Sequence, residues 1–335
     1  MKNRTPLKKY DITQCALYKC RTKKRLEKLL RLEPGGLKAV DDIIVYHKFE
    51  INKKHSDEKR AITAPDKKLK DIQKRILHLL QPVIRPEWLI SGEKRKCYID
   101  NGKAHLNGKY VLTVDIKKFY DNCTRESVYQ FLVLKLKTSP DVAEILTNII
   151  TYNGGIPTGC PTSQIMAFYA YSDMFSEIAD AAKQCGCKFT LYVDDMTFSS
   201  KEQFSPDRLR QMIDCILRKY GHKPKYSKVK YYGFSDYKPI TGTIVTPEQT
   251  LAVPNGLQKT IYTAFQEVKP LVGTEVHSDE DVKRILSLKG QIQAARNIEK
   301  GKFPEIRRLT DQIGVPVMDN RRKRKALIEQ RTTTE

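Results

Sequence analysis

The stretch Lys188-Phe-Thr-Leu-Tyr-Val-Asp-Asp-Met-Thr-Phe-Ser-Ser200 decides how this chain is interpreted. Apolar and polar residues alternate around two adjacent acids, Asp194 and Asp195, with the period of a half-buried strand. The pattern predicts a hairpin with both carboxylates at its turn, where both can reach one space. Because like charges repel, the pair favours a bound cation, and oxygen ligands suit magnesium. A polar Asp-Asp turn without chemistry explains the pair equally well by itself.

The composition of the chain indicates its broad class. Its 335 residues suggest about two domains at ~150 residues each, or one large domain with appendages. The formal net charge of +22 predicts a polyanionic partner, with nucleic acid first and a membrane surface second. The sequence shows no signal peptide and no apolar run of about 18 residues, so we expect a soluble cytoplasmic protein without a membrane partner. The cysteine spacing does not match a zinc site.

The order of predicted elements indicates an α+β core with basic helical segments at both ends. Residues 110–115 form an apolar run that ends in an acid, which is typical of a buried strand. A Gly/Pro loop over residues 154–159 leads into a helix from about Pro161, and its apolar face extends to Ala182. From Leu257 onward the pattern is helical again.

Three carboxylates converge if the strand that ends in Asp115 lies beside the hairpin of Asp194 and Asp195. Two-metal phosphoryl transfer uses such a cluster, because one ion lowers the pKa of the attacking hydroxyl and the other neutralises charge on the leaving pyrophosphate. The structural alternative for Asp115 is an N-cap for the segment that follows it.

Three motifs resemble those of reverse transcriptases, and they occur in the same order along the chain. Asp115-Ile-Lys-Lys-Phe-Tyr120 resembles their first catalytic motif, and Tyr192-Val-Asp-Asp195 resembles their YxDD motif. Between them, Gly155-Ile-Pro-Thr-Gly-Cys-Pro-Thr-Ser163 is similar to their Gly-x-Pro-Gln-Gly-x-Pro-x-Ser loop, with Thr158 in place of the usual Gln. Together the order and spacing are specific, and the match runs from about residue 60 to residue 245.

Further elements narrow the resemblance to retron reverse transcriptases. These elements are the finger-like segment Arg60 to Lys70, Asn101-Gly-Lys-Ala-His105, and Ile240-Thr-Gly242. The chain departs from the retron pattern at Gly102, where Ala is usual, and at Lys225, where Asn is common. The resemblance implies a right-hand polymerase with fingers, an antiparallel palm sheet and a helical thumb.

This resemblance also implies a division of the chain into domains. We expect N-terminal basic helices and fingers over residues 1–107 and a palm with the catalytic motifs over residues 108–245. Part of residues 124–170 returns to helices of the fingers and palm. A helical thumb and a basic tail follow over residues 246–335.

Catalytic roles follow from the resemblance residue by residue. The metal ligands would be Asp115, Asp194, Asp195 and the backbone carbonyl of Ile116, holding two magnesium ions that manganese can replace. Lys228 would protonate the leaving pyrophosphate, although a solvated basic strand is the plain alternative. Tyr120 would lie under the sugar and reject a 2′-hydroxyl, so that deoxynucleotides are preferred; a core aromatic is its alternative.

Other residues would contact the substrates. The predicted nucleotide-binding residues are Arg60, Lys70, Tyr120, Thr158 and Gly159. The predicted nucleic-acid-binding residues are Asn101, His105, Tyr192, Thr241, Gly242, Arg321, Arg322 and Lys323. The structural alternatives are a solvated surface cation for the basic residues, a satisfied buried histidine for His105, and a simple loop-to-helix junction at Gly159.

The retron resemblance also implies partners. It implies a cognate structured non-coding RNA as template and primer, deoxynucleotides, an RNA-linked single-stranded DNA product (msDNA), and a separate effector protein in defence against phage. A non-retron defence or intron-derived reverse transcriptase is the alternative within the same class, and Thr158 keeps it open. A catalytically silent RNA-binding scaffold is the alternative from another class, and the intact carboxylates argue against it.

Overall fold

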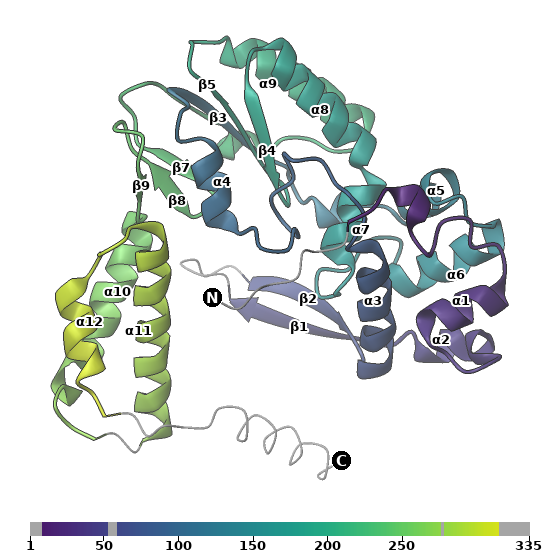
Figure 1. The fold of residues 1–335 in the computed structure, drawn as a ribbon, viewed down its shortest axis with the longest axis horizontal. Coiled ribbons are helices and arrows are strands. Elements are labelled where there is room, and N and C mark those ends of the chain that lie inside the picture. The colour runs from purple at the N-terminus through teal and green to yellow at the C-terminus, as the bar shows by residue number, and fades with distance from the viewer. Residues whose placement is uncertain (1–8, 53–58, 276–277, 315–335) are drawn as a thin grey trace. The chain divides into compact units, whose positions relative to one another are not determined.

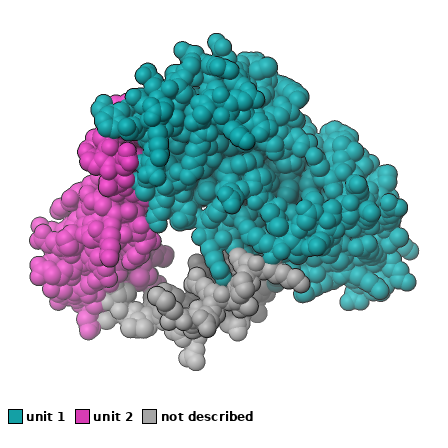
Figure 2. All heavy atoms as spheres, turned by 45° about the horizontal axis from the view of Figure 1, so that its top comes forward, with its two compact units in different colours: residues 1–235 teal, residues 236–335 magenta. Residues whose placement is uncertain are grey.

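Figure 1 shows the fold, a computed structural model that describes residues 9–52, 59–275 and 278–314. By its internal contacts the chain divides into two compact units, residues 1–235 and residues 236–335, which Figure 2 shows in different colours. The predicted palm boundary at residue 245 lies inside the second unit. The boundaries of fingers, palm and thumb stay predictions.

The first unit contains a two-stranded hairpin and a four-stranded sheet, and both are antiparallel. The hairpin pairs β1 (Tyr46–Asn52) with β2 (Lys59–Pro65). The sheet has the strand order β4-β5-β3-β6. Its strands are β3 (Tyr110–Asp115), β4 (Lys188–Tyr192), β5 (Asp195–Ser200) and β6 (Lys230–Tyr232). The prediction of a mixed helix and sheet fold with an antiparallel sheet is therefore confirmed.

Helices of the first unit pack on this sheet and beside the hairpin. They are α1 (Lys23–Leu30), α2 (Val40–Ile43), α3 (Lys67–Leu80), α4 (Tyr98–Ala104), α5 (Arg125–Gln130), α6 (Pro140–Ile150), α7 (Ser163–Ala170), α8 (Ser172–Gln184) and α9 (Pro206–Lys219). Figure 1 shows α8 and α9 side by side next to the sheet. The core between the layers buries Phe175 and Ile178 of α8 with Phe189 and Phe198 of the strands. Burying these apolar faces fixes the sheet beneath the site.

One predicted element is wrong: the helix expected to run from Pro161 to Ala182 is interrupted. The structure ends α7 at Ala170 and begins α8 at Ser172, with Tyr171 between them at φ −118° and ψ 23°. The Tyr171 hydroxyl donates a hydrogen bond to the carbonyl of Asn122 (3.1 Å) and accepts one from the N–H of Thr124 (3.1 Å). This tertiary anchor breaks the helix, and the local apolar pattern does not reveal it.

The second unit combines a small antiparallel sheet with three-helix packing. Its strands are β7 (Lys238–Ile240), β8 (Thr243–Val245) and β9 (Leu251–Ala252), and its helices are α10 (Asn255–Val268), α11 (Asp279–Ile298) and α12 (Pro304–Asp311). These helices confirm the helical pattern predicted after residue 257, as far as residue 314. Arg321, Arg322 and Lys323 lie outside the described residues. Among the described residues, no helix has the length and apolar character needed to cross a bilayer.

Candidate active site

The three predicted acids lie at one end of the four-stranded sheet. Antiparallel pairing of β3 with β5 places Asp115 directly opposite Asp195. Pairing of β4 with β5 places Tyr192 opposite Asp195, so Val193 and Asp194 form the two-residue turn of the hairpin. The N–H of Ile116 donates to the carbonyl of Asp194 (3.2 Å), which ties the end of β3 to this turn. The structure therefore makes the strand and the hairpin neighbours.

The hairpin turn has an unusual backbone conformation. Val193 has a φ of +61°, in the left-handed region that β-branched residues rarely adopt. A two-residue antiparallel turn needs positive φ to match the twist of its strands, which explains the conformation but not how a valine holds it. The Val193 N–H donates to the hydroxyl of Ser91 (2.8 Å), a residue that the motifs did not indicate.

A lysine balances the charge of one of the acids. The Nζ of Lys228 lies 2.6 Å from Oδ2 of Asp115. The backbone brings them together, because the N–H of Lys225 donates to the Asp115 carbonyl (2.7 Å) and the segment after it forms a short 3₁₀ turn over Tyr226–Lys228. Partial burial alone would lower the pKa of Lys228, but its hydrogen bond to Asp115 and the nearby carboxylates raise it. Lys228 is therefore an ammonium ion at the site.

The surroundings of Asp195 disfavour the ionised form of its carboxyl. Burial, followed by repulsion from Asp194 and Asp115, raises its pKa from 3.8 to about 6, and the Lys228 charge offsets only part of this. Carboxylates that repel one another, so that the pKa of one of them is raised, are suited to bind a hard divalent cation. The described part of the chain contains no ready-made cluster of three acidic, histidine or cysteine ligands. The chemistry of the donor set fits a metal ion, while Asp115 is engaged by Lys228.

The raised pKa of Asp195 predicts a pH-dependent stability of the metal-free protein. Its carboxyl ionises in the unfolded chain at a lower pH than in the fold, so the native state loses stability as pH rises from about 4 through about 6. We expect Asp195→Asn to raise the free energy of unfolding at pH 8 by roughly 3 kcal/mol and to change it little at pH 4. Denaturant unfolding with chelator present measures this.

The matched control for that prediction is Asp207→Asn, the same change at an exposed carboxylate on α9. It should leave the difference between the two pH values as in the wild-type protein. An Asp195→Asn variant that is equally destabilised at both pH values would contradict the electrostatic explanation.

The two motif tyrosines follow or end the strands that carry the acids, Tyr120 after β3 and Tyr192 at the end of β4. Tyr120 begins a 3₁₀ turn (Tyr120–Asn122) after β3, is half-buried, and packs on Phe119 with ring centroids 5.6 Å apart. Tyr192 ends β4 beside Asp195, and burial together with the charges of Cys97 and Asp195 raises its pKa. The structure places Tyr192 beside Asp195, and the roles of both tyrosines toward sugar and nucleic acid stay predictions.

The loop between the two catalytic motifs packs on β2. The Gly159 N–H donates to the carbonyl of Thr63 (3.0 Å), and the Thr158 hydroxyl donates to the carbonyl of Ala61 (3.3 Å). A Cβ on Gly159 would lie 2.5 Å from the Thr63 oxygen, so only glycine permits this approach. Lys70 is exposed on α3, and Arg60 is on β2, where its side chain is not described.

This close approach gives a second prediction. We expect Gly159→Ala to lower the free energy of unfolding by about 1–3 kcal/mol, because the loop must move away from β2. Gly290→Ala is the matched control: it lies inside α11, its Cβ would meet nothing within 4 Å, and alanine should stabilise the helix by about 0.5–1 kcal/mol. Thermal unfolding of both variants measures the contrast. Equal melting temperatures would contradict the close packing.

Two residues predicted to contact RNA are buried instead. Asn101 and His105 both have 0% exposed area, on and just after α4. The two ring nitrogens of His105 lie 2.7 Å from the hydroxyls of Ser199 and Thr190, and burial, with the charge of Lys188, lowers its pKa to about 3. A direct contact of either side chain with RNA is therefore not supported. His105 is a neutral structural residue that ties α4 to two strands.

The remaining predicted contacts lie in the second unit. Thr241 and Gly242 form the turn between β7 and β8, with φ values of +41° and +80°. The left-handed conformation at Gly242 is available to glycine without steric cost, whereas Thr241 adopts it as a non-glycine residue. Their predicted contact with a primer stays a prediction.

The comparison with known proteins identifies the class. Residues 51–250 match the family described as "Reverse transcriptase (RNA-dependent DNA polymerase)", and this segment contains β3, the hairpin and the glycine loop. The match covers more than half of the chain, so the chain belongs to the reverse transcriptase family.

Within this family the chain is of the retron type. It is 26% identical over 172 residues to the Retron Se72 reverse transcriptase of Salmonella heidelberg, covering 51% of this chain and 45% of that protein. It is 24% identical over 206 residues to the Retron Ec86 reverse transcriptase of Escherichia coli, covering 61% and 64%. It is 27% identical over 234 residues to the Retron Ec48 reverse transcriptase of Escherichia coli, covering 65% and 57%. The chain thus spans about half the length of the curated relatives it matches, and the family predicted from the motifs is confirmed.

Proposed function

We propose that this protein is an RNA-directed DNA polymerase that copies a cognate structured non-coding RNA into RNA-linked single-stranded DNA. The observation that carries the proposal is the register that places Asp115 opposite Asp195, with Asp194 in the adjoining turn. Membership of the reverse transcriptase family and likeness to retron enzymes support the same reaction and the same kind of template.

Divalent metal ions complete the chemistry in this proposal. Two magnesium ions, which manganese can replace, would be held by Asp115, Asp194 and Asp195 with the carbonyl of Ile116, and would supply the charge needed to activate a hydroxyl and stabilise pyrophosphate. Lys228 supplies the proton for the leaving group, because its ammonium lies beside the acids. Tyr120 favours deoxynucleotides by excluding a 2′-hydroxyl.

Nucleic acid is the partner that the charge favours. The net charge of +22 suits binding along a phosphate backbone. Folded RNA is recognised largely through shape and 2′-hydroxyls, which suits a dedicated non-coding RNA. The right-hand division into fingers, palm and thumb, a separate effector protein and a role in defence against phage belong to this proposal, with the retron relatives as their support.

The test is an analysis of the nucleic acid that copurifies with the protein after expression with its flanking DNA. We expect a short DNA joined to RNA, sensitive to DNase and RNase and released by a 2′–5′ debranching enzyme. Unbranched DNA would favour a non-retron reverse transcriptase. RNA alone, with no DNA synthesis after deoxynucleotides and magnesium are added, would refute the polymerase and favour an RNA-binding scaffold.

A further inference from the structure

The turn that carries Asp194 depends on a valine in a conformation that valine disfavours. Val193 is held at φ +61° between Tyr192 and Asp194, and its β-branched side chain makes this region costly. Strained backbone of this kind persists only where surrounding contacts hold it. The position of Asp194 therefore depends on whatever fixes the backbone of residue 193.

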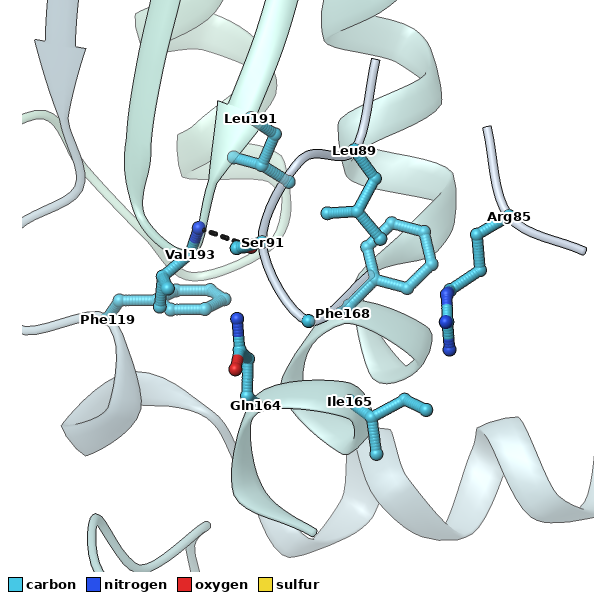
Figure 3. A pocket seen from close by; sticks show the side chains of 10 residues that line it. Arg85, Leu89, Ser91, Phe119, Gln164, Ile165, Phe168, Leu191 and Val193 are labelled. Atoms are coloured by element: carbon cyan, nitrogen blue, oxygen red, sulfur yellow. Dashed lines mark hydrogen bonds between the residues drawn. The ribbon is translucent and has the colours of Figure 1, made fainter. Parts of the chain in front are cut away.

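Ser91 makes the contact that holds residue 193 itself, beside the Ile116 N–H that holds the Asp194 carbonyl. Its hydroxyl oxygen accepts the Val193 N–H at 2.8 Å, and Ser91 is 5% exposed, so water does not compete freely for the bond. Figure 3 shows this bond at the edge of a small cavity that is also lined by Phe119 and Gln164. The cavity has room for about one water molecule.

The segment that carries Ser91 runs along the hairpin like an added edge strand. The N–H of Leu191 donates to the carbonyl of Trp88 (2.8 Å), and the N–H of Ile90 donates to the carbonyl of Leu191 (3.0 Å). The Trp88 ring also packs on the ring of Phe189, 5.3 Å away. These contacts hold residues 88–91 against β4, so the Ser91 hydroxyl is presented to the turn from a fixed position.

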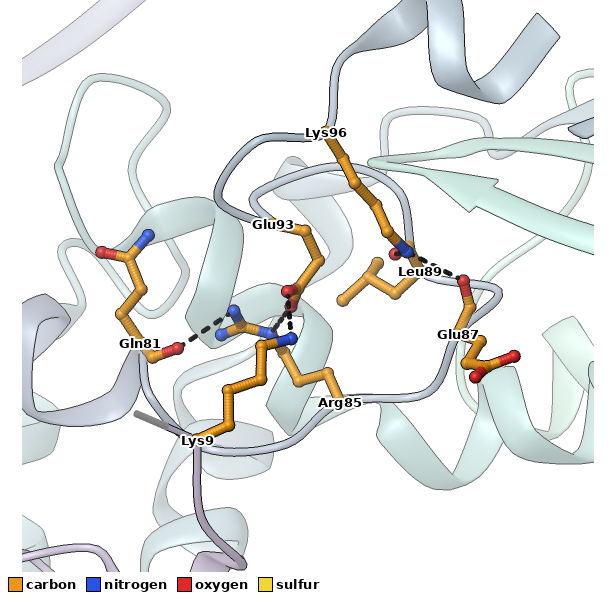
Figure 4. A network of polar contacts seen from close by, with 7 residues as sticks. All are labelled: Lys9, Gln81, Arg85, Glu87, Leu89, Glu93 and Lys96. Carbon is orange, nitrogen blue, oxygen red and sulfur yellow. Dashed lines mark hydrogen bonds and ion pairs between the residues drawn. The ribbon is translucent and has the colours of Figure 1, made fainter. Parts of the chain in front are cut away.

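A buried charge network anchors the loop around this segment. Arg85 forms an ion pair with Glu93, with side chains only 2% and 5% exposed, and Lys9 approaches the other carboxylate oxygen of Glu93 at 3.0 Å. The Nζ of Lys96 donates to the carbonyls of Glu87 (3.1 Å) and Leu89 (3.3 Å). Figure 4 shows these contacts, which link residues 85–89 to residues 93–96, and Ser91 lies between the two segments in the sequence. The buried ion pair and the two hydrogen bonds of Lys96 make the loop a rigid support.

We propose that Ser91 is a positioning residue that holds the Val193 backbone and so orients Asp194 and Asp195 for metal binding. The inference rests on the proposed polymerase function and adds a residue from outside the catalytic motifs. Groups that orient metal ligands from behind commonly change activity or metal affinity 10- to 100-fold when removed.

The experiment compares Ser91→Ala, Ser91→Thr and the control Ser176→Ala on full-length protein. Ser176 lies exposed on α8, where its hydroxyl donates to the Ser172 carbonyl (2.9 Å), so the same change there is remote from the turn. Two readouts are taken: steady-state DNA synthesis on an RNA template with a DNA primer, and Mn²⁺ binding followed by electron paramagnetic resonance. The second readout does not depend on catalysis.

We expect Ser91→Ala to lower kcat about 10- to 100-fold, with the KM for deoxynucleotide changed less than threefold, and to weaken Mn²⁺ binding about 10-fold. Ser91→Thr keeps the hydroxyl, and the neighbouring cavity accepts much of its methyl group, so it should restore most of kcat and Mn²⁺ affinity. Ser176→Ala should match the wild type.

Three results would overturn the inference. They are wild-type kcat and Mn²⁺ affinity in Ser91→Ala, a Ser91→Thr variant as defective as Ser91→Ala, or a lowered melting temperature with unchanged Mn²⁺ affinity. Wild-type protein that binds Mn²⁺ but makes no DNA would instead refute the proposed polymerase function. In that case the Mn²⁺ titration still tests the role of Ser91.

Discussion

Asp194→Asn is expected to reduce DNA synthesis by about 1,000-fold or more, the scale lost when a group that stabilises transition-state charge is removed. Asn keeps the shape of the side chain and its carbonyl oxygen but removes the negative charge that, in the proposed function, would bind a divalent ion. The Ile116 N–H bonds to the backbone carbonyl of Asp194, which the substitution keeps, so the turn should stay in place. Primer extension on an RNA template, under excess magnesium, measures the loss.

The control for this prediction is again Asp207→Asn, which removes the same charge from an exposed site on α9. It should synthesise DNA at the wild-type rate. RNA binding by Asp194→Asn should stay within threefold of wild type, because the change touches one charge in a chain with a net charge of +22. An Asp194→Asn protein that still makes DNA at the normal rate would refute the assignment of the active site.

Lys228→Gln is expected to lower the rate of DNA synthesis about 100- to 10,000-fold, the range supplied by a positioned general acid. The same substitution should not weaken binding of Mn²⁺, and we expect binding to tighten. The reason is that the ammonium lies 2.6 Å from Oδ2 of Asp115 and competes with a metal ion for that oxygen. Opposite changes in rate and metal affinity would distinguish a proton donor from a residue that only holds Asp115.

Lys219→Gln provides a closely matched control for Lys228. Its Nζ lies 2.7 Å from Oε1 of Glu177, and its side chain is 61% exposed, against 54% for Lys228. Removing this surface ion pair should leave both rate and metal affinity unchanged. Lys228→Gln with weaker Mn²⁺ binding and a proportionate loss of rate would show that the lysine acts through the fold of the site, and the general-acid role would be wrong.

The hairpin of Asp194 and Asp195 shows how much of the structure a local sequence pattern can predict. Alternation around Asp194 and Asp195 predicted both strands and the turn, and the structure has β4 end at Tyr192 and β5 begin at Asp195. The apolar run before Asp115 likewise forms β3. Strands and turns follow from a period of two and from residues a few positions apart, so a single sequence contains the information needed.

The misjudged residues share a different cause. The break at Tyr171 and the burial of His105 both depend on contacts with segments remote in sequence, at Asn122 and Thr124 for the first and at Thr190 and Ser199 for the second. The motif resemblance placed His105 among RNA contacts, but the packing of α4 on the sheet encloses it. Helical periodicity and motif spacing carry no information about contacts with residues that are remote in the sequence.

By itself the sequence determined the family, the strand and hairpin that carry the acids, and the basic character that suits a nucleic-acid partner, because these depend on motif order, local periodicity and net charge. The tertiary structure alone decided which groups meet: Asp195 opposite Asp115, Lys228 on Asp115, and Ser91 beneath Val193. The physical reason is distance along the chain. Ser91 and Lys228 lie 102 and 113 residues from the partners they bond, and only burial of the common core, which no local pattern encodes, brings such segments into contact.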